Sequence, residues 1–244
     1  MSLIVQKYGG KSLATTELIR DVAQRIVERR KEGFDLVVVV SAMGDSTNRL
    51  LALAHEISPH PSQRELDMLL SAGERISMSL LSMALNEMGQ ASISFTGSQS
   101  GIVTDSAHNN AKILEIRADR IRKELESGRI VIVAGFQGVS LDREITTLGR
   151  GGSDVTAVAL AVALGALRCE FYKDVDGIYT EDPKVNSSAK KMESCHYEEV
   201  MTLVKKGAKV FHPTAIELAQ KHSIPLYLSS SFDSEPGTTI KSHV

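Results

Sequence analysis

The sequence has few cysteines, few aromatic residues and no tryptophan. Its two cysteines, Cys169 and Cys195, are too few for a disulfide framework, and neither lies in a nucleophile motif. Aromatic residues make up 5% of the chain, which disfavours a base-stacking surface for nucleic acid. The 28 basic and 30 acidic residues nearly cancel, leaving a formal net charge of −2 that argues against polyanion binding. These absences favour a small ligand held in a pocket.

The sequence also lacks a long hydrophobic run. Its least polar stretch, residues 155–167, contains Thr156 and Gly165 and is too short to cross a bilayer. The apolar start, residues 1–7, is too short for a signal peptide. We therefore expect a soluble, cytoplasmic protein with no membrane partner. The 244 residues, 42% of them hydrophobic, are enough for one large domain over residues 1–244 with a substantial core.

Strand and helix patterns alternate along the chain. Short apolar runs predict strands at residues 3–6, 36–40, 92–96, 130–134, 169–173 and, last, 225–229. Helical spacing of apolar residues predicts helices at residues 13–31, 49–57, 65–88, 111–127, 154–164, 196–206 and 214–222, with the 65–88 helix buried. Residues 136–148 alternate as a hairpin does. The pattern predicts an α/β fold, a three-layer α/β/α sandwich with a mostly parallel central sheet.

Three segments are candidates for binding an anionic ligand. Gly149-Arg150-Gly151-Gly152-Ser153-Asp154 precedes a long apolar helix, so unpaired N–H groups and the positive end of the helix dipole would face outward there. Lys7-Tyr8-Gly9-Gly10 ends the first strand, where glycines let the backbone approach phosphate. The acidic run 174–183 follows the strand at 169–173, a position where α/β sheets tend to hold ligand. None of them is a Walker loop, because no Gly-x-x-x-x-Gly-Lys-Ser/Thr occurs.

Three further motifs make the pattern specific: Ser41-Ala42-Met43-Gly44, Gly73-Glu74-Arg75 and Lys209-Val210-Phe211-His212-Pro213. In order and spacing the six motifs resemble the catalytic domain of the aspartate kinases, in the amino acid kinase family, from about Leu3 to Ile240. The resemblance implies ATP-dependent phosphorylation of the L-aspartate side chain to 4-phospho-L-aspartate, the first step toward lysine, threonine and methionine. It also implies ATP and Mg²⁺ as cofactors and a homo-oligomer, most simply a dimer. Mg²⁺ would be held mainly by ATP phosphates, with no metal site on the protein.

The resemblance assigns the catalytic role to Lys7, Asp154 and Lys209. Lys7 would reach the β/γ-phosphates, and Lys209 is similar to the family's second phosphate-contacting lysine. The alternatives are an ordinary exposed lysine at residue 7 and a solvated lysine beside Lys205 and Lys206 at residue 209. Asp154 would orient the lysines, although a helix cap remains an alternative. A carboxylate nucleophile is already ionised at neutral pH, so no general base is needed.

The remaining expected contacts divide between nucleotide and amino acid. ATP binding is assigned to Lys7, Tyr8, Gly9, Gly10, Lys173, Asp174, Tyr179, Lys184 and Lys209. Aspartate binding is assigned to Ser41, Thr47, Glu74, Arg150, Gly151, Gly152 and Ser153. Arg150 suits a bidentate grip on a carboxylate, and Glu74 suits the α-ammonium group. A structural salt bridge between Arg150 and Glu74 is the alternative.

Four residues depart from the family's commonest sequence: Lys11, Lys173, Lys184 and Ser229. Lys11 and Lys173 each add a cation near the expected phosphate track, which suits either tighter nucleotide binding or an altered substrate or rate. Residues 1–244 include no regulatory ACT domain of the kind usual in the family, so we expect no feedback inhibition of this chain by lysine or threonine.

Other function classes remain alternatives. A sibling kinase for glutamate, acetylglutamate, carbamate or UMP would share the Lys7 and glycine features, as would a non-catalytic nucleotide-binding paralogue. A dinucleotide-binding oxidoreductase is disfavoured, because no Gly-x-Gly-x-x-Gly follows the first strand.

Overall fold

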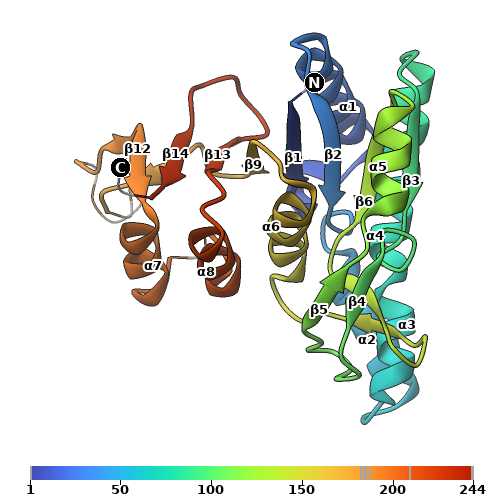
Figure 1. The fold of residues 1–244 in the computed structure, drawn as a ribbon. Coiled ribbons are helices and arrows are strands. Elements are labelled where there is room, and N and C mark those ends of the chain that lie inside the picture. Colours follow the sequence, from blue (N-terminus) through green and yellow to red (C-terminus); the bar gives the residue numbers. More distant parts are fainter. Residues whose placement is uncertain (1, 182, 184–185, 187, 209, 243–244) are drawn as a thin grey trace.

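The computed structural model describes residues 2–242 except 182, 184–185, 187 and 209. At its centre lies an eight-stranded sheet with the order β12-β14-β13-β9-β1-β2-β6-β3 (Figure 1). Every neighbouring pair is parallel except β13 with β14. The predicted α/β fold with a mostly parallel sheet is confirmed. The strands are β1 (Leu3–Tyr8), β2 (Asp35–Val40), β3 (Ser92–Phe95), β6 (Ile130–Ala134), β9 (Arg168–Lys173), β12 (Ser194–His196), β13 (Leu226–Ser230) and β14 (Thr238–Lys241).

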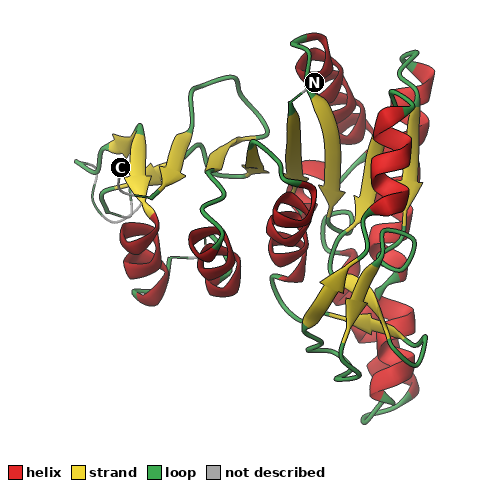
Figure 2. Cartoon of the chain, in the orientation of Figure 1, coloured by secondary structure: helices red, strands yellow, loops and turns green. Residues whose placement is uncertain are grey.

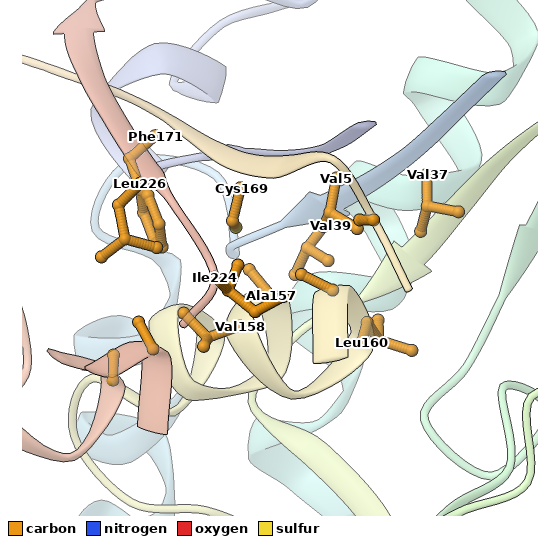
Figure 3. Close-up of a cluster of buried hydrophobic side chains, with 14 of the residues drawn as sticks. Val5, Val37, Val39, Ala157, Val158, Leu160, Cys169, Phe171, Ile224 and Leu226 are labelled. Carbon is orange, nitrogen blue, oxygen red and sulfur yellow. The ribbon is translucent and has the colours of Figure 1, made fainter. Parts of the chain in front are cut away.

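Helices cover both faces of this sheet (Figure 2). One face packs against α1 (Thr16–Lys31) and α4 (Ala72–Glu87), and the other against α5 (Asp119–Glu126), α6 (Gly152–Leu164), α7 (Tyr197–Lys205) and α8 (Pro213–Lys221). Side chains alternate along a strand, so β2 sends its even-numbered valines to the α1 face and Val37 and Val39 to the α6 face. Burial on both faces of the sheet explains why residues 36–40 are all apolar. Figure 3 shows the α6 side of this core, where strand residues meet Ala157, Val158 and Leu160.

The remaining elements lie beyond the carboxyl edge of the central sheet or beside it. A four-stranded sheet has the order β5-β4-β7-β8, and β10 pairs with β11 in a short ribbon. Strands β7 and β8 are antiparallel neighbours, which confirms the expected hairpin. No helix in the described part of the chain is long and apolar enough to cross a membrane. The bounds are β4 (Ile102–Thr104), β5 (Ile113–Ile116), β7 (Gln137–Ser140), β8 (Ile145–Thr147), β10 (Ile178–Tyr179), β11 (Lys191–Met192), α2 (Ser46–Ile57), α3 (Gln63–Leu70) and a 3₁₀ turn, Gly10–Leu13.

The long helix predicted over residues 65–88 is wrong in one respect, because it is two helices, α3 and α4, that meet at Ser71. The Ser71 carbonyl accepts a hydrogen bond from Gln137 Nε2 at 2.9 Å, and its hydroxyl donates to the Met68 carbonyl at 2.9 Å. The expected burial is also incomplete, since Ile76 and Met83 are 53% and 65% exposed.

The helix predicted over residues 111–127 is wrong over its first half. Residues 113–116 form β5, which pairs with β4, and only residues 119–126 are helical. The helix predicted from residue 13 begins at Thr16, where the Thr15 hydroxyl accepts from the Leu18 amide. Strands β4, β10, β11, β12 and β14 had no counterpart in the prediction, and because β14 follows β13, the strand at 225–229 is not the last.

Candidate functional site

Most predicted site residues lie at one edge of the central sheet. Strands β9, β1, β2 and β6 are adjacent and parallel, so their carboxyl ends meet there. Lys7 lies near the end of β1, Lys173 ends β9 and Ser41 follows β2. Helix α6 begins at the same edge, because a Cβ on Gly135 would lie 2.9 Å from Cβ of Ser153. Ligands of open α/β sheets bind at this edge.

A buried carboxylate with two ammonium groups forms the centre of the edge. Lys7 Nζ lies 2.9 Å from Oδ1 of Asp154, and Lys173 Nζ lies 2.7 Å from Oδ2. Lys173 also donates to the Val210 carbonyl at 2.6 Å and lies over the ring of Phe211. The lysine side chains are 8% and 14% exposed. Lys7 is therefore not an ordinary exposed lysine.

These three charged side chains carry one more cation than anion. Burial alone would raise the pKa of Asp154, but the ammonium groups of Lys173 and Lys7 outweigh it and hold that pKa well below its ordinary value. Burial lowers the pKa of Lys173, and Asp154 offsets this only in part. Asp154 does not cap its helix: the N-cap of α6 is Gly151, and Asp154 lies in the first turn. The helix dipole adds positive potential here, so the site attracts an anion.

Glycines keep the strand ends close together around this cluster. The Gly44 amide donates to the Gly10 carbonyl at 2.9 Å, and a Cβ on Gly10 would lie 2.8 Å from the Ala42 carbonyl oxygen. A Cβ on Gly9 would lie 3.7 Å from Lys7 Nζ. The absence of side chains at these positions leaves the ammonium group of Lys7 approachable by a ligand.

Glu74 is buried at the start of α4, beside the loop that follows β2. Its Oε1 accepts from the Ala42 amide at 3.1 Å. Gly73 permits this approach, because a Cβ there would lie 2.8 Å from Cβ of Ala42. Burial raises the pKa of Glu74 to about 7, against the lowering effects of backbone amides and of Lys7. Its Oε2 is buried and finds no hydrogen-bond partner among the described residues, so a ligand ammonium group would satisfy it.

The turn that carries Arg150 lies beside this edge. Arg150 itself is exposed, whereas Gly152 and Ser153 are buried in the first turn of α6. Within the described residues Arg150 and Glu74 form no ion pair, so the alternative of a structural salt bridge is not realised. Gly151 has a φ of +78°, and a Cβ there would lie 2.5 Å from the ring of His212, which makes His212 a packing residue.

The other substrate-binding prediction, Thr47, lies in the first turn of α2 and is half-buried. The Tyr8 ring is fully buried and stacks on Tyr172 with centroids 4.9 Å apart, so Tyr8 can meet a ligand only through its backbone. Ser229 is also buried, and its hydroxyl donates to the Glu235 carbonyl at 3.3 Å.

The predicted nucleotide loop pairs with its own neighbours. Lys11 Nζ lies 2.6 Å from Oδ2 of Asp174, with both side chains exposed. The Tyr179 hydroxyl donates to Asp176 at 3.0 Å, and Lys191 lies 3.2 Å from the same carboxylate. Lys184 and Lys209, both predicted to bind ATP, lie outside the described residues.

Two features of this region were not found from the sequence: the pairing of Lys173 with Asp154, and the buried carboxylate of Asp67. The pairing of Lys173 with Asp154 has no local signal, because the two residues meet only through the fold. Asp67 did have a local signal in the sequence, because it shares the apolar face of α3 with Leu66 and Leu70, where a carboxylate is unusual. The described part of the chain contains no group of three or more His, Cys, Asp or Glu side chains arranged to hold a metal ion.

Comparison with known proteins identifies the family of the chain. A family model described as the amino acid kinase family matches residues 2–230. The chain belongs to the amino acid kinase family. Among curated members, the aspartokinase of Mycobacterium tuberculosis is 53% identical over 241 residues, which cover 98% of this chain and 57% of that relative. The chain thus spans little more than half the length of this relative.

Solved structures show the same family fold. The aspartate kinase from Synechocystis superposes with a TM-score of 0.89 and 48% identity, covering 99% of this chain and 40% of that one. Aspartokinase III of E. coli, solved in complex with aspartate and ADP, has a TM-score of 0.89 at 29% identity and covers 99% of this chain and 65% of that one. At a TM-score of 0.89 both share the fold described above.

Proposed function

We propose that this chain transfers the γ-phosphoryl group of ATP to the side-chain carboxylate of L-aspartate, forming 4-phospho-L-aspartate and ADP. A carboxylate oxygen forms a bond to the γ-phosphorus while the bond from that phosphorus to the β-phosphate oxygen breaks. The similarity to aspartokinases supports the choice of substrate. We further propose that residues 1–244 act as one catalytic domain, and the homodimer remains a prediction.

The observation that carries the proposal is the buried cluster of Lys7, Asp154 and Lys173. Transfer of a phosphoryl group needs cations and N–H donors aligned before the reaction, because charge builds on the oxygens in flight. Two ammonium groups fixed by one carboxylate supply the cations, and the first turn of α6 supplies N–H groups and dipole. Asp154 holds each ammonium group by a separate oxygen, so neither lysine must reorganise during transfer.

The amino-acid end of the proposed site has complementary charges. Glu74 offers a buried oxygen without a partner, which suits the α-ammonium group of aspartate. Arg150, on the turn before α6, suits the α-carboxylate by a bidentate contact. Ser41 and Ser153 lie at the same edge and offer hydroxyl groups. These contacts would leave the side-chain carboxylate of aspartate facing the lysine cluster.

Mg²⁺ fits this arrangement as part of the nucleotide complex. In the described residues no carboxylate cluster is built to hold a metal, whereas phosphate oxygens are the ligands Mg²⁺ prefers in nucleotide sites. When bound, Mg²⁺ would neutralise phosphate charge, and Lys7 and Lys173 would hold the phosphates from the protein side.

The test is a substrate panel with Mg-ATP and hydroxylamine, which traps acyl phosphates as hydroxamates. We expect aspartyl hydroxamate from L-aspartate and little product from L-glutamate, because one extra methylene misplaces the attacking oxygen. A misplacement of ~1 Å typically costs on the order of a hundredfold in rate. Equal turnover of both amino acids, or product only from another carboxylate, would contradict the proposal.

A further inference from the structure

Asp67, on α3, is a fully buried carboxylate that joins three segments of the chain. Its Oδ1 accepts from the Thr147 hydroxyl at 2.5 Å and from the Asn109 amide at 3.1 Å. Its Oδ2 faces His108 Nδ1 at 2.6 Å and the same Asn109 amide at 3.2 Å. Helix α3, the loop before β5 and strand β8 are thus tied to one side chain.

One of these ties leads to the turn that carries Arg150. Thr147 ends β8, and Arg150 follows three residues later. The loop on the other side of Asp67 supports the same turn, because a Cβ on Gly149 would lie 3.0 Å from the Asn109 carbonyl oxygen. The Thr147 carbonyl also accepts from the Ala111 amide at 2.9 Å. Asp67 therefore holds both the strand that enters the turn and the loop that packs beneath it.

The backbone of Asp67 is hydrogen-bonded to the residue that precedes the helix of Glu74. The Asp67 carbonyl accepts from the Ser71 amide at 3.0 Å and so closes the last turn of α3. Ser71 is the N-cap of α4, in which Glu74 lies in the first turn, and Gln137 Nε2 donates to the Ser71 carbonyl at 2.9 Å. Asp67 is thus hydrogen-bonded both to the segments around the Arg150 turn and to the start of the helix that carries Glu74, the two groups that the proposed function assigns to the charged ends of aspartate.

We propose that Asp67 is a positioning residue for the amino-acid half of the site, one that sets the spacing between Arg150 and Glu74. The proposal rests on the proposed function for the identity of the ligand. A carboxylate on an apolar helix face costs free energy of desolvation unless several donors compensate it, whereas an apolar residue would pack there without that cost. Asp67 holds the Arg150 turn through hydrogen bonds of fixed direction, which an apolar contact cannot supply.

The kinetic test compares Asp67→Ala, Asp67→Asn and Thr147→Val with the unmodified chain. Arg150 and Glu74 would bind the two charged ends of aspartate and make no contact with ATP, so their displacement should raise KM for aspartate more than KM for ATP. We expect Asp67→Ala to raise KM for aspartate ~tenfold or more, with KM for ATP within about twofold. Asp67→Asn should recover much of the loss, because its oxygen still accepts from Thr147 while His108 can present its other tautomer to the amide group.

Thr146→Val is the matched control. Thr146 is buried next to Thr147, but its hydroxyl pairs with Thr104 at 2.6 Å within the small sheet. It should leave both KM values unchanged. Thr147→Val removes a single bond to Asp67 and so keeps the test valid if Asp67→Ala fails to fold. Equal changes in both KM values, or none in the Asp67 and Thr147 variants, would overturn the proposal.

Hydrogen exchange measured without substrate separates this proposal from the proposed function. In Asp67→Ala and Thr147→Val the amides of residues 147–153 should exchange about tenfold faster, because a locally less stable turn opens more often. Thr146→Val should not change them. An unmodified chain without aspartate kinase activity would refute the proposed function, whereas unchanged exchange in residues 147–153 would refute the positioning role of Asp67.

Discussion

Glu74 should make the unliganded protein less stable as the pH rises, and replacing it should reverse this. Burial raises the pKa of Glu74 from 4.5 to about 7. Between these two pH values the folded chain holds a proton at this site that the unfolded chain has lost. The free energy of unfolding therefore falls as the pH rises from about 4.5 to 7, and the penalty is complete above pH 7. Below pH 4.5 the site contributes no penalty.

The size of the effect follows from the same shift. Each pKa unit corresponds to about 1.4 kcal/mol, so a rise of about 2.5 units corresponds to about 3 kcal/mol. Glu74→Gln cannot ionise and avoids this penalty. We expect the Gln variant to be up to about 3 kcal/mol more stable than the unmodified chain at pH 8 and similar to it at pH 4.5. The same variant should bind aspartate poorly, because an amide does not offset the charge of an ammonium group.

Urea unfolding at pH 4.5 and pH 8, without ligands, measures the difference. Glu87→Gln is the matched control, because Glu87 is exposed at the last turn of the same helix, and its replacement should change the unfolding free energy little at either pH. A Gln variant at residue 74 that is no more stable at pH 8 than the unmodified chain would refute the reasoning. So would an equal gain at both pH values.

Two other substitutions test the same site. Lys7→Ala should lower kcat by roughly a hundredfold with a smaller effect on ATP binding, because Lys7 would be a preorganised donor to the charge that builds on the phosphoryl group during transfer. The exposed Lys205→Ala is the control, and near-normal turnover by Lys7→Ala would contradict the catalytic role of Lys7. Gly73→Ala should raise KM for aspartate, because the new methyl group would lie 2.8 Å from Cβ of Ala42 and must push Glu74 away from the Ala42 amide. An unchanged KM for aspartate in initial-rate assays would contradict this, because it would show that the helix accommodates the methyl group.

The strands at the centre of the sheet followed from the sequence where they are short runs rich in Val, Ile and Leu. The run at 36–40 is such a case, and it forms β2 between two strands. Residues 113–116 were misread as helix rather than strand because Ile113 and Ile116, three residues apart, have the spacing of a helix face and not the alternation of a strand. Only the pairing with β4 decides between them, and that pairing is a property of the fold.

In the candidate site, too, local motifs could be predicted from the sequence, whereas contacts between distant residues could not. Glycines that permit close approach were visible as motifs, and Gly73 and Gly10 lie against Ala42 as such motifs require. The break at Ser71 was not visible, because the hydrogen bond that stabilises it comes from Gln137 in a distant strand. The partner of Asp154 at Lys173 was hidden for the same reason: residues on different elements meet only when the sheet is complete.

The place of β1 in the sheet has a consequence for synthesis of the chain. This first strand is central in the sheet: one edge pairs with β2, and the other pairs with β9, where Ile4 lies opposite Arg168. Strand β9 is synthesised more than 150 residues after β1 begins. While the ribosome is still making the intervening residues, that edge of β1 has no partner strand, and an unpaired edge invites association with other chains. The cluster of Lys7, Asp154 and Lys173 therefore forms late, and incomplete translation products that end before β9 carry an open strand prone to aggregation.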